Sequence, residues 1–197
     1  MITLAPIWNL MVANRRLFSD NIKHMDVISH ILLGKILSFF GKKTENKIFW
    51  VLLFSIAADI ILIPFYIFLG KENGRFLWVA QNQDWAGASL AHPFLTGMYD
   101  TTHSIIFLLL IIFPIVLFFR LPKMAFFVYF FHIVLDIFTH TGEWAIKIIY
   151  PLNFKIGGFS DAWAWPVSAM AVCWIILSAT IFLTGIYYKN VASADQN

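Results

Sequence analysis

Apolar residues run along this chain in long blocks that short polar segments separate. Four blocks, over residues 48–69, 104–121, 124–141 and 166–188, have about the length that a helix needs to cross a bilayer. A fifth block, over residues 26–40, is shorter and could form a tilted or partial crossing. The pattern therefore predicts an all-α helical bundle in a membrane, with about five transmembrane helices, of which one is short or partial.

Two longer polar connections, over residues 70–99 and 142–165, separate these blocks. Both contain Trp residues, which suit the interface between membrane and water. The coherent pattern begins at Met25, which is an alternative start for the chain, and we expect one membrane-embedded domain over residues 25–190. The flanking segments are expected to be an N-terminal extension and a disordered tail, residues 1–24 and 191–197.

The composition also indicates a membrane protein. Hydrophobic residues make up 60% of the 197 residues and charged residues 13%, whereas soluble domains contain roughly 45–50% and about 25%. We therefore expect an integral, multi-pass protein of a cell's inner or plasma membrane, in contact with membrane lipid. The net charge is +3, but the basic residues form no cluster that resembles a nucleic-acid surface, so no nucleic-acid partner is expected. The single cysteine, Cys173, excludes an intrachain disulfide.

The charges leave the number of spans open between four and five. With four spans, the basic residues of segment 1–24 lie on the cytoplasmic side, as the positive-inside rule favours. With five spans, His30 starts from the same side of the membrane as His103 and His140. A chain that begins at Met25 removes the conflict between the two, because the basic residues of the extension are then absent.

Three residues with metal-ligating side chains interrupt the apolar block at 124–141. His132, Asp136 and His140 follow one another at intervals of four residues. In an α-helix these side chains drift only about 40° per step and therefore share one face. Burying three polar groups on one apolar helix is costly unless they share a partner, and a metal ion would be such a partner.

Further polar residues reach similar depths in the five-span arrangement. Asp59 lies at the centre of its block, where a carboxylate costs at least about 2.5–3.5 kcal/mol and should face the bundle interior. Taken alone, Asp59 could equally form a hydrogen-bonded pair with a neighbouring helix. His30 and His103 enter from the outer side. The bundle would thus gather four His and up to four Asp in its outward half.

Two aspartates accompany the outer histidines. Asp26 precedes His30 by four residues and is expected to cap the first helix. Asp100 precedes His103 by three residues. It could cap the helix over residues 104–121, or it could orient the His103 imidazole without touching the metal itself.

Imidazole and carboxylate groups together suit Zn²⁺, Mn²⁺ or Fe²⁺ better than Ca²⁺. Because His132 and His140 are about 12 Å apart along a helix, one ion could not easily take all three ligands of the triplet. Two ions about 3.5–4 Å apart, with Asp136 between them, fit better, and that arrangement is typical of two-metal hydrolysis.

Several of these segments together resemble one protein family. Met25-Asp26-Val27-Ile28-Ser29-His30, Thr102-His103-Ser104 and the block from His132 to Gly142, with Pro151 downstream, resemble elements of the YdjM-like inner-membrane metal-dependent hydrolases. That family is described as related to zinc-dependent phospholipase C and single-strand nucleases. The resemblance implies a metal-ligating set of His30, Asp59, His103, His132, Asp136 and His140.

The chain departs from the family's pattern in two places. Where the family has a Pro-Asp-x-Asp element, the segment Ala58-Asp59-Ile60-Ile61 keeps one acid. An Arg that often precedes the Thr-His-Ser element is replaced, and Asp100 lies three residues before His103 instead.

Pattern and resemblance together predict a membrane-bound metal-dependent hydrolase that cleaves an ester or phosphodiester bond at the membrane surface. Its cofactor is expected to be a divalent metal, zinc above all, as one or two ions that activate water. Asp59 or Asp136 would bridge the ions or act as the base. The substrate is left open, with a phospholipid as one candidate.

Two other classes of protein compete with this prediction. One is a transporter or permease with an intramembrane His/Asp relay, and the other is a structural membrane protein with a vestigial metal site. A transport pathway needs polar groups on both sides of the membrane midplane, whereas these residues crowd one half of the bundle.

Overall fold

The computed structural model of the chain describes residues 25–40, 47–60, 62–75, 82–85, 87–162 and 165–194. These residues are organised as helices, and the only β-pairing among them is one isolated antiparallel bridge between Ile146 and Ile156. The all-α prediction is therefore confirmed. The predicted extension over residues 1–24 lies outside the described residues.

The helices follow the apolar blocks of the sequence, with additional short helices between them. In chain order the elements are α2 (Met25–Ser38), α3 (Lys47–Ile60), α4 (Leu62–Glu72), α5 (Asn82–Trp85), α6 (Ala88–Ala91), α7 (Pro93–Thr102), α8 (Ile105–Phe107), the π-helix η2 (Leu108–Ile112), α9 (Phe113–Phe118), α10 (Lys123–Thr139), the 3₁₀-helix η3 (Gly142–Trp144) and α11 (Val167–Ala194).

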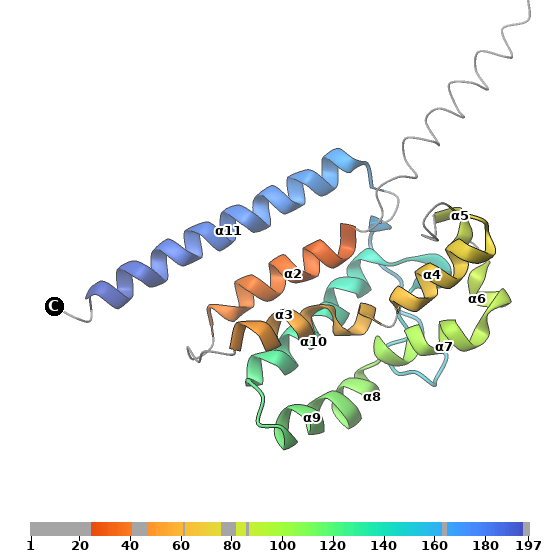
Figure 1. Cartoon of the computed structure of the whole chain (residues 1–197), viewed down its shortest axis with the longest axis horizontal. Coiled ribbons are helices and arrows are strands. Elements are labelled where there is room, and N and C mark those ends of the chain that lie inside the picture. The colour runs from red at the N-terminus through yellow and green to blue at the C-terminus, as the bar shows by residue number, and fades with distance from the viewer. Residues whose placement is uncertain are drawn as a thin grey trace, which may run out of the picture.

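The centre of the molecule is a layer of α2, α3 and α10. Figure 1 shows α11 lying along the outer side of α2, while α3 and α10 pack on the other side of α2. Val51, Ala58 and Ile133 fill the contact between α3 and α10 with almost no exposed surface. Helix α7 packs against α3 from the far side, so residues of α2, α3, α7 and α10 can meet in one place.

A close contact between α2 and α3 brings these two helices together. A Cβ atom on Gly34 would lie 2.7 Å from Cβ of Ser55. Small residues at such a crossing let helix backbones approach closely, which is common in membrane bundles. The contact lies one turn beyond His30 on α2 and one turn before Asp59 on α3.

In the part of the chain that the structure describes, two helical stretches are long and apolar enough to cross a membrane, Lys47–Glu72 with 26 residues and Ser168–Val191 with 24. Pro93–Thr102 and Ile105–Phe118 would make a third if the pair, which is bent by 57°, forms one broken span. Helices α2 and α10 have 14 and 17 residues. At 1.5 Å per residue they reach about 21 and 26 Å, less than the roughly 30 Å of a bilayer core.

The predicted loop over residues 70–99 differs from the structure in its second half. Residues 82–85, 88–91 and 93–102 form α5, α6 and α7. Pro93 begins α7, a position where its missing N–H costs nothing. Trp85, which we expected at the membrane interface, is instead buried against Phe65 and Trp144, with ring centroids 4.8 and 5.2 Å away. At the other end, α11 continues to Ala194, so residues 191–194 of the predicted tail are helical.

Candidate metal centre

Helix α10 carries the centre of the candidate site. His132 and Asp136 lie on its buried face, with 1% and 0% of their surfaces exposed. His140 is also buried, but it caps the C-terminus of α10 in an extended conformation. A loop residue, Gly158, packs so closely there that its N–H donates to the His140 carbonyl at 3.0 Å. His132 and Asp136 therefore share one face of α10, as predicted, and His140 follows just beyond the end of the helix.

Two other elements direct a ligand toward α10. Asp59 extends from the last turn of α3, and its Oδ1 lies 3.4 Å from Nε2 of His103. His103 occupies the break between α7 and α8, where the chain bends. Ser104 begins α8 by accepting the N–H of Ile106 at 3.1 Å. The bend turns His103 out of the helical line and into the bundle.

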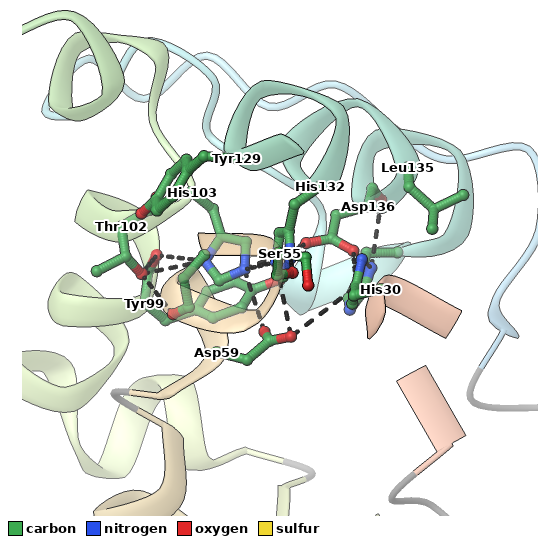
Figure 2. A network of polar contacts seen from close by, with 12 residues as sticks. His30, Ser55, Asp59, Tyr99, Thr102, His103, Tyr129, His132, Leu135 and Asp136 are labelled. Atoms are coloured by element: carbon green, nitrogen blue, oxygen red, sulfur yellow. Dashed lines mark hydrogen bonds and ion pairs between the residues drawn. The ribbon is translucent and has the colours of Figure 1, made fainter. Parts of the chain in front are cut away.

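Asp59, His103, His132 and Asp136 form a compact group. Each offers one ligand atom, and these atoms all lie within 4.8 Å of one another. Oδ2 of Asp136 is 3.2 Å from Nε2 of His103 and 3.1 Å from Nε2 of His132. Figure 2 shows the two imidazole edges and the two carboxylates pointing at one another. This group could hold a metal ion.

Backbone carbonyls set the orientation of both imidazoles. Nδ1 of His132 lies 2.7 Å from the carbonyl oxygen of Ser55, and Nδ1 of His103 lies 2.9 Å from that of Tyr99. A carbonyl oxygen only accepts hydrogen bonds, so Nδ1 of each ring carries the proton. In a neutral imidazole the lone pair is then on Nε2, which faces the carboxylates. Metal-ligating histidines typically have this arrangement.

Several hydrogen-bond acceptors in the four-residue group face one another without a donor between them. Nε2 of His103 and Nε2 of His132 are only 3.4 Å apart, and both oxygens of Asp136 are buried without a hydrogen bond from the described residues. Buried acceptors that face one another are costly unless a cation lies between them. Protons alone would require two imidazolium rings at this short separation, whereas one divalent ion satisfies all four residues. The donor set therefore fits a divalent metal.

His30 and His140 lie on the other side of Asp136. Oδ1 of Asp136 is 3.1 Å from Nε2 of His30 and 3.6 Å from Nδ1 of His140. His30 also stacks on His132, with ring centroids 3.7 Å apart, and its Nε2 is 3.8 Å from Oδ2 of Asp59. All six residues of the expected ligand set thus gather around Asp136, although only four converge on one point.

The structure describes the side chain of Asp100 but not that of Asp26. The carboxylate of Asp100 is buried and pairs with Lys147 of the following loop at 2.6 Å, while Ser104 provides the cap that we had considered for Asp100. The side chain of Asp26 lies outside the described residues.

The sequence reasoning did not identify the residues that support the imidazoles. Thr102 donates to the carbonyl of Ala58 at 3.2 Å, and Tyr129 donates to the carbonyl of Thr102 at 2.7 Å. The Thr102 contact links α7 to α3, and the Tyr129 contact links α10 to α7, so together they fix the bend at His103. Tyr129 lies three residues before His132 on the same helix face, which is the one signal that could have indicated it.

No model of a known protein family matches the chain, and neither the curated proteins nor the solved structures give a match.

Proposed function

We propose that this protein is an integral membrane hydrolase that uses a divalent metal, zinc above all, to cleave an ester or phosphodiester bond at the membrane surface. The observation that carries the proposal is the arrangement of His103 and His132. Their Nδ1 atoms donate to backbone carbonyls, while their Nε2 atoms lie 3.1–3.2 Å from Oδ2 of Asp136. The resemblance to the YdjM-like hydrolases supports the same reading.

In this proposal His103, His132 and Asp136 would hold the metal, with the carboxylate of Asp59 next to them. Three imidazole or carboxylate ligands that leave a further position open are typical of catalytic zinc sites. When bound, the ion would lower the pKa of water towards about 7 and polarise the bond to be cleaved. Zinc is preferred because imidazole nitrogens together with carboxylate oxygens are the ligands of many catalytic zinc sites.

Asp59 is the residue that we assign to proton transfer. Its side chain is 15% exposed, whereas those of His103, His132 and Asp136 are only 1% exposed. Asp59 is thus the most exposed of the four residues, and its carboxylate can accept a proton from a water molecule. Asp136, enclosed on all sides by histidines, is better suited to hold the metal.

His30 would be the imidazole ligand of a second ion, while His140, whose Nδ1 also lies 3.2 Å from the carbonyl oxygen of Asp136, would support Asp136 at this side. Both histidines flank Oδ1 of Asp136, while His103 and His132 flank Oδ2. A carboxylate whose two oxygens face different imidazole pairs is suited to bridge two ions. We therefore propose up to two ions, with Asp136 between them.

Metal analysis of the full-length protein, purified in detergent, tests the proposal. We expect at least one equivalent of a divalent metal, and zinc-dependent release of product from an ester or phosphodiester lipid. His132→Ala should lower metal affinity by well over about tenfold, because even residues behind metal ligands contribute 10–100-fold. Loss of metal should abolish activity.

His92→Ala is the matched control. His92 pairs with Glu72 at 3.0 Å on the far side of α7, away from the four-residue group. This variant should keep both metal and activity. A His132→Ala protein that retains its full metal content would overturn the assignment.

A further inference from the structure

An apolar cavity lies beside the metal centre. It has a volume of about 270 Å³ and lies between α2, α10 and α11. Its lining residues are Ser29, Leu33, Leu135, Thr139, Ala162, Trp165, Met170, Cys173, Ile176 and Leu177. None of the described functional residues of the metal centre is among them, so the cavity is separate from the ligand group.

The two hydroxyl groups in this lining are engaged elsewhere. Oγ of Ser29 accepts from Nε1 of Trp174 at 3.3 Å, and the Thr139 hydroxyl donates to the carbonyl of Leu135 at 3.0 Å. What remains facing the cavity is almost wholly hydrocarbon and sulfur. An apolar ligand would therefore gain by entering, and a polar group would lose its hydrogen bonds with water.

The cavity opens at the outer surface of the bundle. Ile176 on α11, one of its lining residues, is 58% exposed. Ser29, Leu135 and Thr139 line it from α2 and α10, and each directly precedes a residue of the centre, namely His30, Asp136 and His140. Consecutive side chains on a helix point about 100° apart, so the cavity lies beside the centre without opening into it.

The surface around the outer end favours a lipid over a soluble ligand. On the outer side of α11, Val172, Ile175 and Phe182 are exposed by more than half of their surfaces. The helix carries no charged residue between Val167 and Tyr188. Such a surface belongs in the hydrocarbon core, so a lipid tail is the molecule that meets the cavity mouth.

We propose that this cavity binds the end of an acyl chain of a membrane lipid. The volume lies just below the roughly 300–1,000 Å³ of sites for whole small molecules. It suits a segment of one hydrocarbon chain, while the headgroup of the lipid stays outside the cavity.

The test uses a lysophospholipid that carries a diazirine near the end of its acyl chain. The full-length protein in nanodiscs is irradiated with this probe, and mass spectrometry locates the label. We expect label on Leu33 and Leu135, which line the cavity on α2 and α10. Label confined to exposed residues such as Ile175 and Phe182 would show only surrounding lipid and would overturn the proposal.

Cys173→Trp should fill the cavity and reduce label on Leu33 and Leu135 by about tenfold, because a large side chain leaves no room for the probe. Ile175→Trp is the matched control on α11, since Ile175 is 67% exposed and does not line the cavity. Leu177→Trp repeats the test from the next turn in case the first variant does not fold. Unchanged labelling in a folded filled variant would overturn the proposal.

Metal content is measured on the same samples, which separates the two proposals. The filled variants should keep the metal of the wild type, because no metal-ligating residue is changed. A wild type that binds metal but shows no label at Leu33 or Leu135 refutes the acyl-chain site alone. A wild type that is labelled there but binds no metal refutes the hydrolase and leaves a lipid-binding cavity.

Discussion

Asp136 is the residue whose two oxygens face different halves of the candidate centre. Its Oδ2 faces His103 and His132, and its Oδ1 faces His30 and His140, all within 3.6 Å. We therefore expect Asp136→Asn to lower metal affinity by more than about tenfold, since it removes the negative charge and replaces one of the two oxygens that face the histidine pairs by an NH₂ group. Metal content after dialysis against a weak chelator measures the effect.

Asp100→Asn is the control for that experiment. Asp100 is also a buried aspartate, but its partner is Lys147 at 2.6 Å, outside the metal group. Breaking this pair should lower the stability of the protein while the metal stays bound. Equal metal loss in both variants would mean that any buried carboxylate supports the site, and would refute the special position of Asp136.

At the scale of residues, the sequence predicted the members of the candidate group better than the residues that support them. Intervals of four residues placed His132 and Asp136 on one helix face, and the cost of a mid-membrane carboxylate placed Asp59 in the interior. The carbonyl oxygens of Ser55 and Tyr99 could not be predicted, because every residue has a carbonyl and only tertiary packing selects one. His140 lies just beyond the last residue of α10, and the periodicity of apolar residues does not define the residue at which a helix ends.

At the scale of elements, the approach of α2 to α3 determines how close His30 comes to Asp136. Gly34 contacts Ser55, and a Cβ at this position would lie 2.7 Å from Cβ and 2.8 Å from Oγ of Ser55. Gly34→Ala should therefore destabilise the protein by about 1–3 kcal/mol through overpacking. Thermal unfolding in detergent, followed by the loss of helical signal, measures this change.

The compensating change is Ser55→Gly, which removes both clashing atoms and keeps the carbonyl that orients His132. The double variant should be more stable than the sum of the two single effects predicts, by about 1 kcal/mol or more, because the residues are in direct contact. Strictly additive effects would show that the α2–α3 contact tolerates a methyl group.

The elements that sequence reasoning missed are those held by tertiary contacts. Short helices such as α5 and α6 have four residues each and cannot be stable alone. They form because Trp85 and Ala88 are buried in the core and because Arg75 donates hydrogen bonds to Asp84 at 2.6, 2.9 and 3.2 Å. The long apolar helices were predictable, since a bilayer demands length and hydrophobicity that the sequence shows directly.

At the scale of the whole molecule, the candidate centre requires a particular direction of α2. His30 lies near the start of α2, and Asp136 lies near the end of α10, yet their side chains meet. The first residues of α2 and the last residues of α10 are therefore at the same depth. If α2 crosses, the N-terminus and the loop around Lys155 lie on one side of the membrane, which is the five-span arrangement.

Labelling of introduced cysteines decides between four and five spans. In a Cys173→Ser background, cysteines replace Lys123, Lys155 and Lys189, all exposed, and a small tag is added before Met1. Impermeant maleimide should reach positions 123 and 189 from one side and position 155 from the other, because α10 and α11 each separate them. With five spans the tag is accessible together with position 155. If the tag is accessible together with position 123, α2 does not cross, and His30 reaches Asp136 from a re-entrant helix that enters and leaves on one side.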